Sequence, residues 1–112
     1  FILNNQYMGM VRQWQELLHE KNYSESYTAA LPDFVKLAEA YGCVGIQATK
    51  PDELDDKINE MINVNQPVIF DCRVDPAENC FPMIPSGKPH NQMLLGPEDE
   101  KEEVSDEGKT LV

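Results

Sequence analysis

The sequence contains 112 residues, which is enough for one small domain with a modest hydrophobic core. Its nine basic and 20 acidic residues give a formal net charge of −11 at pH 7. This charge repels nucleic-acid phosphates and anionic membrane surfaces, so we expect neither as a partner.

The first residues predict the end of a buried strand, because the apolar triplet Phe1-Ile2-Leu3 runs directly into two asparagines. No initiator Met precedes the triplet, and we therefore expect the chain to be a piece of a longer protein. An amphipathic helix is predicted over residues 9–20, where apolar side chains recur at helical spacing. These side chains are Met10, Val11, Trp14, Leu17 and Leu18.

Two further helices and two further strands follow. Pro32 suits the first turn of a helix that ends at Gly42. A short strand at residues 44–48 precedes a helix that starts at residues 51–53, with acidic side chains near the positive end of its dipole. The buried stripe of that helix is expected to consist of Leu54, Ile58, Met61 and Ile62.

Residues 67–74 predict another buried strand. This alternation predicts an α/β fold in which helical layers cover a parallel sheet.

Residues 75–87 contain three prolines, which exclude a regular helix or a central strand. We expect a structured loop there. Its packing residues are expected to be Phe81, Met83 and Ile84. The domain should span residues 1–95, where the apolar content stops. The acidic segment at residues 96–112 should be disordered, because it has too little apolar area to offset its ordering entropy.

The spacing of the three cysteines, Cys43, Cys72 and Cys80, matches no common zinc site. No stretch approaches the roughly 18 apolar residues of a membrane-spanning helix. We therefore expect reduced thiols in a soluble, cytoplasmic protein of the bacterial type. His19 and His90 have no acid or nucleophile at a suggestive spacing, so neither they nor the cysteines are assigned a catalytic role.

Asn4 and Asn5 lie at the carboxyl end of the first predicted strand, which is where ligands bind in parallel sheets. An asparagine oxygen with a nearby main-chain carbonyl suits Mg²⁺ that is bound to a diphosphate. The helix that begins at Gly9 adds N–H donors for the anion. Asparagines in this place also serve simple turns and helix caps, and that alternative stays open on these two residues alone.

The longer string at residues 4–15, NNQYMGMVRQWQ, resembles the end of the thiamine diphosphate motif of acetohydroxyacid synthases (acetolactate synthases). The resemblance covers residues 1–95. It continues through Tyr23-Ser24, residues 31–42 (LPDFVKLAEAYG) and residues 82–87 (PMIPSG). The Gly-Asp-Gly that begins the family motif is missing from this sequence. The resemblance implies the C-terminal half of the thiamine diphosphate-binding fold of a large catalytic subunit.

The resemblance also implies functional roles for the residues that follow the first predicted strand. The resemblance implies that Asn5 and the main-chain carbonyl of Tyr7 hold Mg²⁺, together with the Asp of the missing Gly-Asp-Gly. It places Gly9 among the cofactor-binding residues. Met10 matches the residue that wedges between the two rings of the cofactor and forces its bent shape. Without the resemblance, Met10 would be interpreted as a core methionine on an apolar helix face.

Two more positions match the family's substrate channel. Trp14 matches a tryptophan that lines the channel and shapes the preference for 2-ketobutyrate as second substrate. Ser86 matches a position at the channel mouth. Without the resemblance, Trp14 would be interpreted as core packing and Ser86 as a turn residue.

Members of this family decarboxylate pyruvate on thiamine diphosphate and condense the hydroxyethyl unit with a second 2-ketoacid, pyruvate or 2-ketobutyrate, in branched-chain amino acid biosynthesis. The resemblance implies a homodimer or tetramer of catalytic subunits, a glutamate supplied by the partner subunit and a middle domain that binds FAD, and it leaves open whether a small regulatory subunit attaches. Because these parts lie outside the sequence, we expect the chain alone to be inactive.

Two other functions stay open. One is another thiamine diphosphate-dependent carboligase or decarboxylase, such as glyoxylate carboligase, although Trp14 and residues 82–87 argue against it. A product assay of the full-length enzyme would decide. The other is a non-catalytic interaction module whose acidic tail engages a partner. An open reading frame that begins near Phe1 would favour this second alternative.

Overall fold

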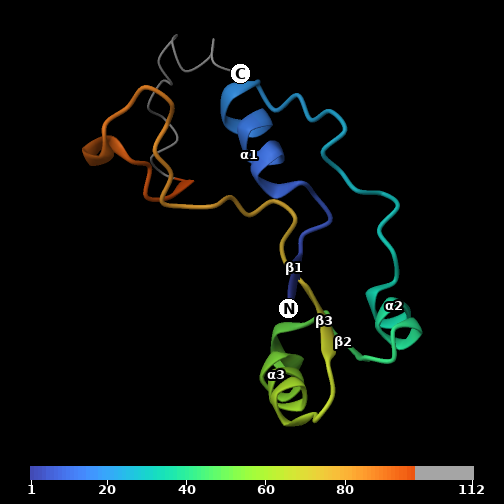
Figure 1. Cartoon of the computed structure of the whole chain (residues 1–112). Helices are drawn as coiled ribbons and strands as arrows, with labels where there is room; N and C mark the ends of the chain where they lie inside the picture. Colours follow the sequence, from blue (N-terminus) through green and yellow to red (C-terminus); the bar gives the residue numbers. More distant parts are fainter. Residues whose placement is uncertain (98–112) are drawn as a thin grey trace. The chain divides into compact units, whose positions relative to one another are not determined.

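The computed structural model describes residues 1–97, which form two compact units. The first unit contains Phe1–Tyr7 and Thr28–Ala77, and the second contains Met8–Tyr27 and, among the described residues, 78–97. The elements occur in the predicted order (Figure 1). They are β1 (Ile2–Asn4), α1 (Gly9–Leu18), α2 (Phe34–Ala40), β2 (Val44–Ala48), α3 (Leu54–Asn63) and β3 (Val68–Arg73), with short 3-10 helices at Pro51–Glu53 and His90–Gln92.

The first unit is built on a three-stranded sheet with the order β1-β3-β2. Both strand pairs are parallel, and Asp71 of β3 is level with Ile2 of β1 and with Gln47 of β2. This arrangement confirms the predicted α/β class with a parallel sheet. Within residues 1–97, β3 is therefore the central strand and has a neighbour on each side.

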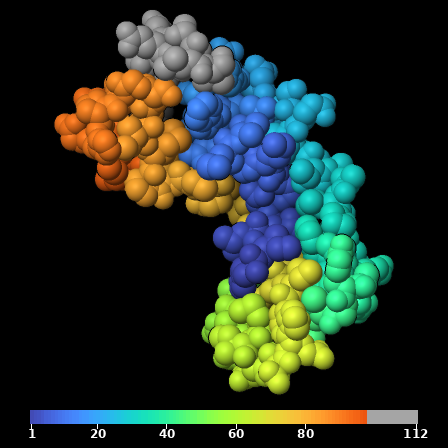
Figure 2. All heavy atoms as spheres, viewed as in Figure 1, coloured from blue at the N-terminus to red at the C-terminus, as the bar shows by residue number. Residues whose placement is uncertain are grey.

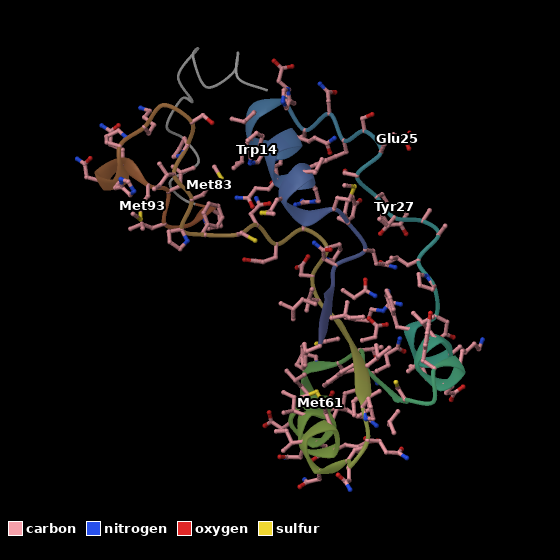
Figure 3. All side chains as sticks on the ribbon, in the orientation of Figure 1. Trp14, Glu25, Tyr27, Met61, Met83 and Met93 are labelled. Atoms are coloured by element: carbon pink, nitrogen blue, oxygen red, sulfur yellow. The ribbon has the colours of Figure 1, made fainter. Side chains whose placement is uncertain are left out.

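One face of the sheet carries the apolar core of the first unit. Its buried side chains are Ile46, Ala48, Phe70 and Cys72. Helix α3 packs against this face through partly buried side chains of its inner side, including Met61 (labelled in Figure 3). The predicted stripe is wrong at one position, because Ile62 is 68% exposed. Ile62 follows Met61 by one helical step of about 100° and therefore turns toward the outer side of α3. Helix α3 itself is part of the yellow-green region in Figure 2.

Helix α2 lies on the opposite side of the sheet from α3 (Figure 1). It approaches β2 so closely that a Cβ at Gly45 would lie 2.7 Å from the Cα of Val35. Only glycine fits this contact without a shift of the backbone. Gly42, with φ +71°, follows the end of α2 as predicted.

The predicted start of α2 is two residues too early. Asp33 is the N-cap residue, so Pro32 precedes the helix instead of lying in its first turn. The main-chain N–H groups of Lys36 and Val35 both donate to Asp33 Oδ1 at 3.1 Å, and they lower the pKa of this carboxyl from its usual value. The side-chain cap overrides the proline signal because it satisfies two otherwise unpaired N–H donors.

Strand β1 is less buried than the apolar triplet predicts. Phe1 and Leu3 are 57% and 69% exposed. Leu3 is level with Cys72 on the core face, but the buried residues of that face belong to β2 and β3. The ring centroids of Phe1 and Phe70 are 4.6 Å apart, so Phe1 contacts the core through Phe70. The expectation of full burial is therefore wrong for this edge strand.

The segment after β3 is a loop through residues 75–87, as predicted. Met83 and Leu94 exchange main-chain hydrogen bonds of 2.9 and 2.7 Å, and Leu94 is buried. Ile84 is 41% exposed, so its predicted packing role is wrong; Pro85 beside it is the buried residue. Alternate residues of an extended segment point to opposite sides, and only one side of this loop packs inward. Nearly all of the predicted acidic tail lies outside the described residues, and the domain limits at 95 and 96 stay predictions.

All three cysteines are free. Within residues 1–97, no cluster of three or more His, Cys, Asp or Glu side chains could hold a metal ion. None of the helices in that same range has the length and apolar character needed to cross a membrane.

The core face predicts a difference between two identical substitutions. Ile46→Val should lower the free energy of unfolding by about 1 kcal/mol, because it removes a buried methylene and leaves a cavity. Ile62→Val is the control, and it should change the free energy by less than about 0.5 kcal/mol at its exposed position. Urea unfolding of the 112-residue chain measures both. Equal losses for the two variants would contradict the assignment of Ile46 to the core.

Candidate functional site

A tight turn at residues 4–7 follows β1, at the carboxyl end of the sheet. Asn4 Oδ1 accepts a hydrogen bond from the Gln6 main-chain N–H at 3.1 Å, and Asn5 Oδ1 accepts one from the Tyr7 N–H at 3.0 Å. Each asparagine thus bonds the backbone two residues further along the chain. Gln6 has φ +62°, a left-handed conformation that is uncommon for a residue with a side chain. Both asparagines therefore serve the turn, as the alternative interpretation of the sequence proposed. This role leaves them able to bind a ligand as well.

The turn is held to the rest of the first unit by Thr28. The Gln6 carbonyl oxygen accepts hydrogen bonds from the Thr28 main-chain N–H at 2.9 Å and from its hydroxyl at 2.7 Å. Asn5 and Tyr7 are both half-buried, and both line a hollow of about 160 Å³ that includes Thr28 and Leu31. The structure therefore brings the two predicted metal ligands into one ordered turn. Neutral amide and carbonyl oxygens of this kind suit a hard cation such as Mg²⁺.

The second unit begins with the N-terminus of α1. Helix α1 starts at Gly9 as predicted and runs for 10 residues. Its N-cap residue, Met8, makes no side-chain capping bond, and no acidic residue lies in the first turn. An N-terminus without a capping side chain presents N–H donors and the positive end of the helix dipole, which favour an anion.

Helix α1 buries polar side chains and exposes apolar ones, which is the reverse of the usual pattern. Arg12 and Gln13 are buried, whereas Met10, Val11 and Trp14 are 72%, 45% and 43% exposed. The exposed apolar residues line a hollow of about 680 Å³ in the second unit, and Trp14 is labelled in Figure 3. Met10 and Trp14 are thus not core residues of the described chain. An exposed apolar patch of this kind marks a binding surface more often than a free surface.

Hydrogen bonds from the polar side of α1 explain this inversion. Gln13 binds the backbone of Cys80 twice: its Nε2 donates to the Cys80 carbonyl at 3.0 Å, and its Oε1 accepts from the Cys80 N–H at 2.9 Å. Arg12 donates to Asn79 Oδ1 at 3.1 Å and pairs with Glu16 at 2.7 Å. Because these bonds turn the polar side toward the loop, Met10, Val11 and Trp14 face outward, whereas Leu17 and Leu18 are half-buried.

Three residues that the sequence did not assign also line the larger hollow: Gln15, His19 and Asn22. The Asn22 main-chain N–H donates to the His19 carbonyl at 2.8 Å, so the chain turns just after α1 and brings these residues back to its exposed side. The only sequence signal was the continuation of the helical stripe toward His19. The turn itself has no motif that would have revealed Asn22.

Ser86 is not among the residues that line the hollow of Met10 and Trp14. It is half-buried in a turn in which the Lys88 main-chain N–H donates to the Pro85 carbonyl at 3.1 Å. The turn interpretation of Ser86 is therefore correct, and its channel role stays a prediction. His90 lies in the second 3-10 helix and is exposed.

Comparison with known families defines the class of protein. Residues 1–72 match the C-terminal TPP-binding domain of thiamine pyrophosphate enzymes. This match covers more than half of the chain, and it includes the asparagine turn and all of the sheet except Arg73, the last residue of β3. The chain therefore belongs to the family of thiamine pyrophosphate enzymes, through their C-terminal TPP-binding domain.

Individual relatives are more specific. The chain is 47% identical over 95 residues to the acetolactate synthase large subunit of Cyanidium caldarium, which covers 84% of the chain and 16% of the relative. It is 43% identical to the acetolactate synthase large subunit of Haemophilus influenzae, over 88% of the chain and 18% of the relative. It is 46% identical to the acetolactate synthase isozyme 3 large subunit of Escherichia coli, over 83% of the chain and 17% of the relative. The chain thus spans less than a fifth of the length of these relatives.

The double hydrogen bond of Gln13 predicts a local change in protection. Gln13→Ala should increase hydrogen exchange of the Cys80 amide by about tenfold, because the N–H loses its acceptor. Gln15→Ala is the matched control: Gln15 lies on the same helix and donates to the Ser24 carbonyl at 2.8 Å instead of to Cys80. Amide exchange followed by NMR measures both variants. An unchanged Cys80 rate in Gln13→Ala would show that other contacts hold the loop.

Proposed function

We propose that this chain is the C-terminal part of an acetolactate synthase catalytic subunit and supplies one part of its thiamine diphosphate site. The proposal rests on the structural features that follow one another along residues 4–14. An ordered turn with neutral oxygens is followed by a helix without a capping side chain, whose exposed side carries Met10 and Trp14 over a hollow. The names of the relatives support the same assignment.

The proposed ion is Mg²⁺, held by the side-chain oxygen of Asn5 and the main-chain carbonyl of Tyr7. Mg²⁺ commonly takes few protein ligands and shares the rest with phosphate and water, so two neutral ligands from this chain suffice for its part. Asn5 Oδ1 already accepts the Tyr7 N–H, and an amide oxygen has a second lone pair for the ion. The first turn of α1, from Gly9, would bind the diphosphate oxygens.

Met10 is proposed to support the bent shape of the cofactor, and Trp14 to line the substrate channel with Ser86 at its mouth. Both Met10 and Trp14 are exposed enough in this chain to contact a ligand. The bound cofactor supplies an electron sink for the removal of CO₂ from pyruvate and for joining the remaining two-carbon unit to a second 2-ketoacid, pyruvate or 2-ketobutyrate. The protein residues contribute by positioning these groups.

The complete enzyme is proposed to need parts beyond this chain. The first part is the rest of the catalytic subunit, including a domain that binds FAD. The second is a partner catalytic subunit that contributes a glutamate, so that the catalytic subunits form a dimer or tetramer. A small regulatory subunit and a cytoplasmic location belong to the same proposal. The chain alone should then bind the cofactor weakly and show no turnover, and a product assay of the complete enzyme distinguishes acetolactate synthase from glyoxylate carboligase.

Asn5→Ala tests the metal site in the complete catalytic subunit. Its affinities for Mg²⁺ and for thiamine diphosphate should fall together by about tenfold or more, since even outer-shell partners of metal ligands cost this much when lost. Calorimetric titration with the cofactor at fixed Mg²⁺ measures the change. Asn59→Ala, at an exposed position of α3, is the asparagine control and should bind normally. Unchanged affinity in Asn5→Ala would contradict the proposed ligand.

Met10→Ala should behave differently from Asn5→Ala. The diphosphate anchor remains in this variant, so cofactor affinity should change little. The saturated rate should fall by about a hundredfold, because small errors in the position of reacting groups cost about this much. Met10→Leu keeps most of the volume and should retain most of the rate. Steady-state kinetics at saturating cofactor measures both, and equal rates for Met10→Ala and the unmodified enzyme would exclude the wedge role.

A further inference from the structure

A buried carboxylate lies in the centre of the sheet, on the face opposite the apolar core. Asp71 of β3 has no exposed surface and is enclosed by polar partners. Asn4 Nδ2 donates to Asp71 Oδ1 at 2.7 Å, and Gln47 Nε2 donates to Asp71 Oδ2 at 2.9 Å. Arg73 Nε lies 3.3 Å from the same Oδ2. All three strands therefore contribute to one polar cluster, and the two oxygens of Asp71 have different partners.

The strand register explains why these residues meet. Gln47 is level with Asp71, and Asn4 is level with Arg73, the next residue on the same face of β3. A central strand of a parallel sheet is normally apolar on both faces, and a charge there must be paired and hydrogen-bonded. A buried ionic cluster seldom stabilises a fold more than apolar residues of similar size would. Stability alone therefore does not account for a carboxylate at this position.

The cluster controls the orientation of one side chain in the turn. Asn4 uses its Nδ2 on Asp71 Oδ1 and its Oδ1 on the Gln6 main-chain N–H. Because the two ends of an amide are a donor and an acceptor, Asp71 decides which end faces the sheet and which end faces the turn. If the amide were reversed, its NH₂ group would face the Gln6 N–H and the bond would be lost.

Gln6 depends on this bond because of its backbone conformation. Its φ of +62° is unfavourable for a residue with a side chain and persists only where surrounding bonds enforce it. Asn4 binds its N–H, and Thr28 binds its carbonyl oxygen. Gln6 lies between Asn5 and Tyr7, so its conformation determines where the Asn5 side chain and the Tyr7 carbonyl are presented.

We propose that Asp71 is a positioning residue for the cation of the cofactor. It acts through Asn4, which sets the Gln6 turn that presents Asn5 and Tyr7, and its own carboxylate does not bind the ion. This inference rests on the proposed function, because it requires Asn5 and Tyr7 to be the ligands. It adds a residue that is 67 positions from Asn4 in sequence and that belongs to a different strand.

An exchange of donor and acceptor tests the proposal in the complete catalytic subunit. Asn4→Asp places two carboxylates at the position of a 2.7 Å hydrogen bond. Its affinity for thiamine diphosphate at fixed Mg²⁺ should fall by about tenfold or more, as expected when a charge-assisted hydrogen bond is lost. In the double variant Asn4→Asp with Asp71→Asn, the new amide at position 71 donates to the new carboxylate at position 4. The other oxygen of that carboxylate still accepts the Gln6 N–H, so affinity should recover to within about threefold of the original.

Gln47→Ala is the matched control. It removes a hydrogen bond to Asp71 Oδ2 and leaves the bond to Asn4 in place. Thermal unfolding should show a loss of stability in this variant, whereas its cofactor affinity should stay near the original value. If Gln47→Ala lost as much affinity as Asn4→Asp, the cluster would be only structural and the proposal would be wrong.

The remaining outcomes are also decisive. A folded double variant whose affinity stays as low as that of Asn4→Asp overturns the proposal, and so does Asn4→Asp with normal affinity. If Asn4→Asp does not fold, recovery of both folding and affinity in the double variant supports the proposal, and a folded double variant with weak binding overturns it. Asn5→Ala is measured in the same series. Normal affinity in Asn5→Ala contradicts the proposed function itself, whereas weak binding there with no effect at positions 4 and 71 overturns only the role of Asp71.

Discussion

The parallel pairing of β3 with both of its neighbours is the constraint on which the first unit depends. It places Ile46 and Ala48 of β2 beside Phe70 and Cys72, which makes the apolar face that α3 covers. The same register places polar side chains of all three strands together on the opposite face. A shift of one residue in a single strand would move the apolar side chains of that strand to the polar face and its polar side chains to the core, because successive side chains point to opposite sides. The core and the polar cluster at Asp71 are therefore consequences of one alignment.

Helix α2 can pack closely on this polar face because different positions of the face make different contacts. At Gly45 the helix backbone nearly touches the strand, and the missing side chain is what permits this distance. At Gln47 and Asp71, two positions along the sheet, hydrogen bonds between side chains occupy the surface instead. The buried charge is thus satisfied by neighbouring strands and requires no partner from α2.

The second unit differs from the first, because α1 is held in place while part of its apolar surface is exposed. The double hydrogen bond between Gln13 and the backbone of Cys80 helps to hold α1, in addition to any apolar contacts of the helix. Such bonds are directional, so they define which side of α1 faces outward more strictly than apolar packing does. The helix can therefore present Met10 and Trp14 over a hollow that a ligand could fill.

The sequence by itself determined the order of the elements, the parallel sheet and the family resemblance. Helical and strand periods depend on local spacing, and the string at residues 4–15 is continuous in the chain. Only the tertiary structure decided that Ile62 and Leu3 are exposed, that α1 buries Arg12 and Gln13, and that Asp71 meets Asn4. Burial and hydrogen-bond partners depend on segments that are distant in sequence, and no local pattern contains the register that brings them together.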